Sequence, residues 1–184
     1  MNETFDRPEY GKNVMEILTV ANDFCLTLDK IYLHKKKFLI DYFQKICPLL
    51  YIKGALLTDI EVLNPDMNER FVTEEQWELL FNELRKIFKE DDEFWYIDNS
   101  KAVDKEPIKA SLSECIADIY QDMKDFVLLY QKSSLDAKQN AIAQLKKTFV
   151  DFWGFKLLLV SSRIHSMLQE NESSEAELNI PELI

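Results

Sequence analysis

The chain has 184 residues, the length of one domain, and 47% of them are hydrophobic, which is enough to build a core. Its 33 acidic and 22 basic residues give a formal net charge of −11. A field of that sign repels nucleic acid and anionic membrane surfaces, so we expect neither as a partner. Only 3 glycines are present, which disfavours turn-rich all-β folds and glycine-rich phosphate loops.

The three cysteines point to a reducing compartment. Cys25, Cys47 and Cys115 are odd in number, widely spaced and set within apolar helical patterns, as buried free thiols are. The first residues hold no apolar signal core, and no run of 18 apolar residues occurs. We therefore expect a cytoplasmic protein.

Helical periodicity dominates the first half of the chain. Apolar residues recur at three- and four-residue steps over 12–33, with a break expected near 29–35. A second stripe covers 38–56, where Pro48 predicts a kink or short break with helix on both sides. Residues 58–72 contain turn chemistry and predict a loop.

The second half continues the pattern. Thr73 and Gln76 form a capping box that opens a helix ending near Lys89. Residues 90–110 predict an irregular, aromatic-containing loop, which could also hold a short strand-like segment. Ser111 opens a further helix with a second capping box, completed by Glu114.

The last helical region begins near Leu135, and its Leu157–Leu159 run favours a centrally buried helix. We predict an all-α fold, an irregular antiparallel bundle of about five or six helices. Residues 1–169 form the single domain in this prediction, and residues 170–184 form an acidic, Ser-rich tail that we expect to be disordered.

Four segments together carry a resemblance to a known family. They are ICPLLYIKGALL (46–57), NERFVTEEQWELLFNELR (68–85), DDEFWYID (91–98) and SECIADIYQDMKDFVLLYQ (113–131). With them the chain resembles a bacterial family known as domain-of-unknown-function family 5063, from about Glu9 to Leu168. The resemblance implies a small all-helical protein and transfers no catalytic residue.

The sharpest candidate for chemistry is an acidic stripe. Glu114, Asp118, Asp122 and Asp125 fall within an arc of about 80° on one helix. Carboxylates grouped in this way suit Mg²⁺ or Mn²⁺ if a second helix contributes. The Glu-x-x-Glu pair Glu75 and Glu78 could do so, as in helical nucleoside-triphosphate pyrophosphohydrolases.

This sequence departs from the pyrophosphohydrolase pattern, however. One residue too many separates Glu114 from Asp118, and the distance along the chain from Glu78 is long. The alternative interpretation is a solvated acidic face.

The aromatic-containing loop supplies a second candidate, a binding surface formed by Asp91, Asp92, Trp95 and Tyr96. Aromatic rings beside carboxylates can form a ligand pocket or a cation cage. They can equally fill a gap between helices.

No complete catalytic set occurs in the sequence. His34 and His165 lack metal-ligand spacing, and no nucleophile motif or nucleotide-binding glycine pattern is present. We therefore expect a non-enzymatic protein-interaction or binding module without a cofactor. Its acidic region 59–98 would contact a basic protein partner. The alternative is a Mg²⁺- or Mn²⁺-dependent phosphohydrolase. The chain would be a monomer, or a homodimer through the apolar residues around 152–160.

Overall fold

The computed structural model describes residues 7–98 and 106–178, with side chains up to residue 170. The predicted all-α fold is confirmed, with one small antiparallel sheet added. The helices are α1 (Lys12–Leu28), α2 (Lys36–Ala55), α3 (Glu74–Phe88), α4 (Leu112–Tyr130), α5 (Leu135–Thr148) and α6 (Gly154–Leu178), and the strands are β1 (Glu93–Ile97) and β2 (Pro107–Ser111).

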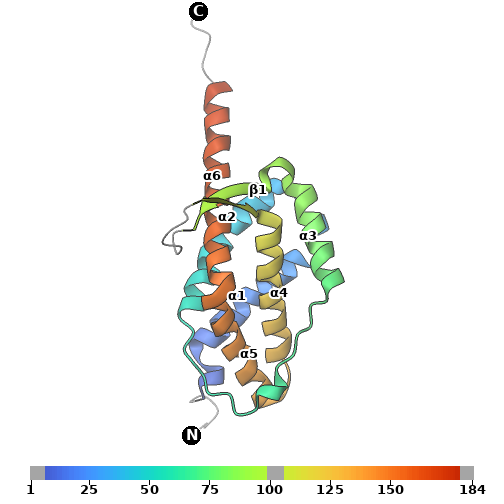
Figure 1. Ribbon diagram of the computed structural model, residues 1–184, viewed down its shortest axis with the longest axis vertical. Coiled ribbons are helices and arrows are strands. Elements are labelled where there is room, and N and C mark those ends of the chain that lie inside the picture. The colour runs from blue at the N-terminus through green and yellow to red at the C-terminus, as the bar shows by residue number, and fades with distance from the viewer. Residues whose placement is uncertain (1–6, 99–105, 179–184) are drawn as a thin grey trace, which may run out of the picture.

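Helix α4 is the centre of the bundle, because it packs against α1, α3, α5 and α6. Figure 1 shows α3 flanking α4 on one side, with α5 continuing upward into the long α6. Helix α2 packs along α6 on the other side. The expectation of a central last helix is wrong, since Leu157 is buried but Leu158 is 47% exposed.

Local sequence signals set the starts of α3, α4 and α5. The capping box of Thr73 and Gln76 forms in full at the start of α3. The Ser111 hydroxyl accepts from the Glu114 backbone N–H at 3.1 Å at the start of α4. α1 ends at Leu28, directly before the predicted break near 29–35, whereas α2 passes through Pro48 as one helix.

Within 90–110 the structure has two paired strands, where the sequence predicts an irregular loop or a short strand-like segment. β1 pairs antiparallel with β2, and Trp95 lies opposite Lys109. Phe94 and Tyr96 are half-buried whereas Trp95 and Ile97 are exposed, the alternation that a strand imposes. Residues 99–105, which connect the strands, lie outside the described residues.

The C-terminal segment differs from the expected disordered tail. The backbone of α6 continues to Leu178, so the first part of 170–184 is helical. Residues 179–184 lie outside the described residues. Within the described ranges, no helix has the length and apolar character needed to cross a bilayer.

Candidate functional site

The acidic stripe of α4 is split between different partners. Asp118 accepts a hydrogen bond from the Trp77 indole Nε1 on α3 at 2.8 Å. Its other oxygen accepts from the Nζ of Lys156 on α6. The carboxylate is therefore neutralised, and it ties together three helices.

Asp125 serves the backbone of the segment that leads into α3. Its Oδ1 accepts the N–H of Phe71 at 2.7 Å and that of Val72 at 3.0 Å. Burial raises the pKa of Asp125, and these two hydrogen bonds and the charge of Arg70 oppose the rise. Asp125 thus positions the start of α3.

Asp122 is the carboxylate with the largest change in acidity. It lies half-buried between Asp118 and Asp125 on α4. Burial raises its pKa to about 6, and the nearby Arg70 guanidinium is the strongest opposing influence. A carboxyl group that titrates near neutral pH in a cleft is typical of a functional position.

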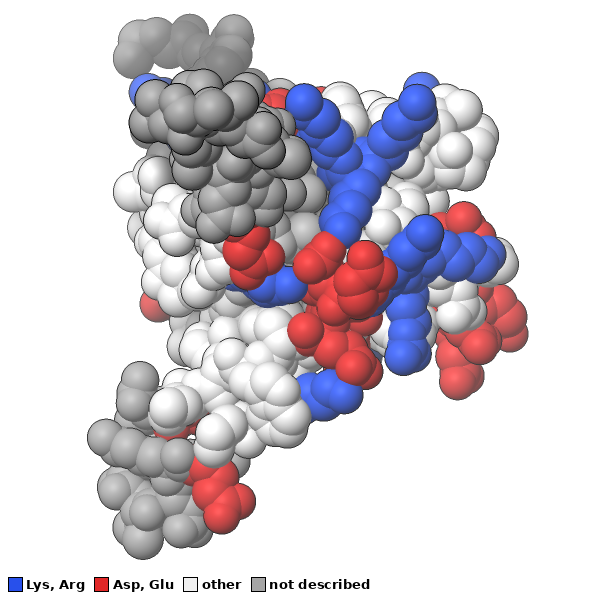
Figure 2. All heavy atoms as spheres, turned by 90° about the horizontal axis from the view of Figure 1, so that it is seen from above, with Lys and Arg blue, Asp and Glu red and all other residues white. Residues whose placement is uncertain are grey.

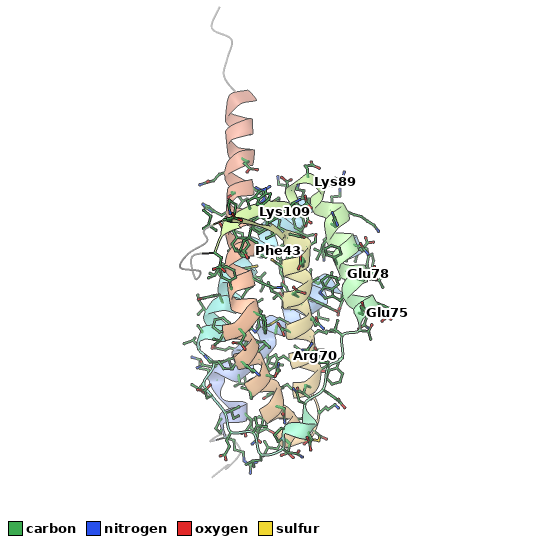
Figure 3. All side chains as sticks on the ribbon, viewed as in Figure 1. Phe43, Arg70, Glu75, Glu78, Lys89 and Lys109 are labelled. Atoms are coloured by element: carbon green, nitrogen blue, oxygen red, sulfur yellow. The ribbon has the colours of Figure 1, made fainter. Side chains whose placement is uncertain are left out.

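The second half of the expected metal site lies elsewhere. Glu75 and Glu78 are exposed, and Figure 3 places both on the outer side of α3. A hydrogen bond from the Thr73 hydroxyl and then one from the backbone lower the pKa of Glu75. Across 7–98 and 106–170, no three His, Cys, Asp or Glu side chains are placed to hold a metal ion. The metal site and the phosphohydrolase activity therefore remain predictions. The described residues do not assemble the set of ligands that such a site needs.

The four residues of the predicted binding surface, Asp91, Asp92, Trp95 and Tyr96, have separate roles. Asp91 pairs with Lys36 on α2 and with Arg163 on α6, the latter at 3.0 Å. Asp92 is buried and accepts the backbone N–H of Ser113 at 2.8 Å. These two carboxylates therefore fix the hairpin to the bundle.

The two aromatic residues of the surface also have different environments. Tyr96 packs edge-on against Phe155 on α6, with ring centroids 5.7 Å apart, so it fills a gap between elements. Trp95 is 66% exposed and is the member of the set that a ligand could reach. Figure 2 looks down on this end of the molecule and shows acidic and basic side chains interleaved. One ion pair of the hairpin joins Lys109 to Glu93 at 2.6 Å.

A groove of about 310 Å³ lies where α3 meets the end of α1 and the 3₁₀ turn η2 (Ile31–Leu33). We call it the α3 groove. Leu79 is 67% exposed and Tyr32 is 72% exposed along its rim. Its lining residues are Leu28, Asp29, Ile31, Tyr32, Gln76, Leu79, Leu80, Glu83 and Tyr120.

Comparison with known proteins identifies the family but assigns no activity. A family model described as a domain of unknown function, DUF5063, matches residues 8–170. The chain belongs to the DUF5063 family. The crystal structure of protein BF1032 from Bacteroides fragilis is similar, with 33% sequence identity and a TM-score of 0.78, covering 88% of this chain and 95% of that one. No curated protein matches the sequence.

In this DUF5063 domain a second cleft was not predicted from the sequence. It opens beside Asp122, has a volume of about 390 Å³, and we call it the α4 cleft. Its basic residues Arg70, Lys147 and Lys156 come from a loop, the end of α5 and the start of α6. The only hint of this cleft in the sequence was Arg70, which is one of four basic residues in the region 59–98, where 13 residues are acidic.

Proposed function

We propose that the protein is a protein-interaction module that binds a basic partner through the α3 groove. The observation that carries this proposal is the exposure of Leu79 and Tyr32 beside carboxylates. Large apolar side chains exposed together and rimmed by charge are typical of protein interfaces.

The floor of the α3 groove is already packed. Leu28, Ile31 and Leu80 are buried in the core, so the groove has a preformed apolar base. Exposed Leu79 and Tyr32 can then cover an apolar side chain of a partner without rearranging the fold. A partner that places one or two apolar side chains here gains the burial on which interface affinity depends.

The charge around the groove selects the partner. Glu75 and Glu78 are exposed on α3 without an ion pair among the described residues, and the half-buried Glu83 on the same helix pairs with Lys86. Asp29 is less available, because it accepts from the Tyr120 hydroxyl at 2.6 Å and pairs with Lys124. A segment with lysine or arginine flanking apolar residues is complementary to this arrangement, and the net charge of −11 speeds its approach.

The test compares capture of partners from cells by the wild-type protein and by a variant with Glu75→Lys, Glu78→Lys and Leu79→Ser. A captured protein is purified and titrated against both. We expect its affinity for the variant to fall by at least about tenfold, because the variant loses both the apolar contact and charge complementarity.

The matched control reverses two exposed carboxylates outside the groove, Glu61→Lys and Glu106→Lys. We expect this control to keep most of the affinity, apart from a salt-dependent reduction in association rate. An equal loss in the control would show that only the overall charge matters, which would refute the α3 groove as the binding surface.

A further inference from the structure

The α4 cleft is lined by residues from several segments that the fold brings together. Arg70 comes from the loop before α3, and Figure 3 shows it beside α4. Gln121 and Asp122 come from α4, and Thr148 from the end of α5. The volume of about 390 Å³ lies in the range of about 300–1,000 Å³ typical of small-molecule sites.

Two of its three cations are available to a ligand. Lys156 is used by Asp118, as described above. Arg70 and Lys147 line the cleft, and neither makes a hydrogen bond or ion pair with another described residue. In a chain with an excess of 11 negative charges, two exposed cations that form no salt bridge with a described residue favour an anionic group on the ligand, although the nearby carboxyl group of Asp122 offsets part of the charge of Arg70.

The remaining polar groups are mainly acceptors and amides. Asp151 stands at the rim, Asp122 lies deeper, and Gln121 and Gln144 add amide groups. Carboxylates accept hydrogen bonds from hydroxyl or amino groups. A ligand with negative charge alone would be repelled by them and would donate no hydrogen bond to them. The combination therefore fits a ligand that has both an anionic group and hydrogen-bond donors.

The wall of the cleft next to α6 is rigid. The π-helical segment η5 (Phe149–Trp153) joins α5 to α6 without a loop. Trp153 is buried and donates its indole Nε1–H to the Leu145 carbonyl at 3.1 Å, which fixes the wide turn. Phe152, in the same segment, is 59% exposed and lines the cleft, so an aromatic side chain is within reach of a ligand there.

We propose that the α4 cleft binds a small organic phosphate that also carries hydroxyl or amino groups. Arg70 and Lys147 hold the phosphate, because a guanidinium and an ammonium give charge-assisted hydrogen bonds to its oxygens. Asp151 and the amides of Gln121 and Gln144 accept from the body of the ligand. A planar ring, where the ligand has one, lies on Phe152.

The test is a calorimetric titration of the full chain with defined probes. The phosphate esters are ribose 5-phosphate and adenosine 5′-monophosphate, and inorganic phosphate, ribose, adenosine and citrate are compared with them. We expect saturable binding of at least one ester. Its affinity should exceed those of the unphosphorylated sugar or nucleoside, of inorganic phosphate and of citrate by about tenfold or more each.

The double variant Arg70→Gln/Lys147→Gln should weaken ester binding by about tenfold or more. Lys30→Gln/Lys37→Gln makes the same change of charge at exposed positions outside the cleft and should bind as the wild type does. Three results would overturn the proposal: no ester binds, citrate or the unphosphorylated probes bind as well as the esters, or the Arg70/Lys147 variant keeps full affinity. Melting temperatures of both variants confirm that each is folded. None of these outcomes depends on the α3 groove.

Discussion

At the scale of single residues, the charge on Asp122 opposes folding. Its pKa is about 6 in the folded protein and about 3.9 in an unfolded chain. The folded state therefore holds an extra proton between about pH 4 and pH 6. Stability falls as the pH rises through that window, and the full penalty applies above it. Allowing for partial exposure to solvent, we take the penalty as about 1–2 kcal/mol.

Asp122→Asn should remove this penalty. We expect its melting temperature to exceed that of the wild type by about 2–6 °C at pH 7.5 and by much less at pH 4. Thermal unfolding followed by circular dichroism at both pH values measures the difference. Exposed Asp59→Asn makes the same change of charge and serves as the control. An equal gain for Asp122→Asn at both pH values would contradict the assigned acidity.

Lys89 is the second residue that departs from its preferred state. It has φ 52° and ψ −120° at the end of α3, and it is the one non-glycine residue with positive φ among those described. A side chain strains this conformation, which glycine adopts freely. Lys89→Gly should therefore raise the free energy of unfolding by about 1 kcal/mol. Lys86→Gly, inside α3, should lower it by about as much. Urea denaturation measures the free energy of unfolding of both variants. If glycine changed it in the same direction at both positions, Lys89 would not be strained.

At the scale of elements, α2 packs so closely against η5 (the π segment) that a side chain at Gly54 has no room. A Cβ on Gly54 would lie 2.4 Å from Trp153 and 2.7 Å from Phe149. Because Trp153 is fully buried, these rings cannot move aside cheaply. Gly54→Ala should therefore lower the free energy of unfolding by about 1–3 kcal/mol, despite the better helix propensity of alanine.

Chemical denaturation of Gly54→Ala measures this loss. Gly11→Ala is the control. Its added Cβ would lie 3.1 Å from its nearest neighbour, the Pro8 carbonyl oxygen, so we expect a smaller loss of stability than at Gly54. If Gly54→Ala were as stable as the wild type, the packing of α2 against the π segment would be looser than described.

At the scale of the whole molecule, the acidic stripe should not behave as a metal centre. Asp118 is neutralised by Lys156, Asp125 serves backbone N–H groups, and Glu75 and Glu78 face solvent. We expect Mn²⁺ or Mg²⁺ at millimolar concentration to leave the melting temperature unchanged within about 1 °C. A specific site filled at a hundred times its dissociation constant would add about 2.7 kcal/mol, or roughly 5–10 °C. Such a rise, abolished in Asp118→Asn, would restore the phosphohydrolase hypothesis.

The sequence predicted what local patterns can determine. The α3 capping box and the break after α1 follow from neighbouring residues, and both could be located before the structure. The hairpin was harder to predict, because β2 is a short, polar segment that becomes a strand only by pairing with β1. The α4 cleft could not be predicted, since Arg70, Asp122, Lys147 and Lys156 meet only in the folded chain.

The packing of α2 along α6 also bears on how the protein is made. These two helices share one of the largest interfaces of the bundle, although α2 ends at Ala55 and α6 begins only at Gly154. During synthesis the apolar face of α2 therefore has no partner until the residues of α6, about a hundred positions further along the chain, have left the ribosome. Closure of the core is a late, long-range event, and the unfinished chain is the form most exposed to aggregation and to capture by chaperones.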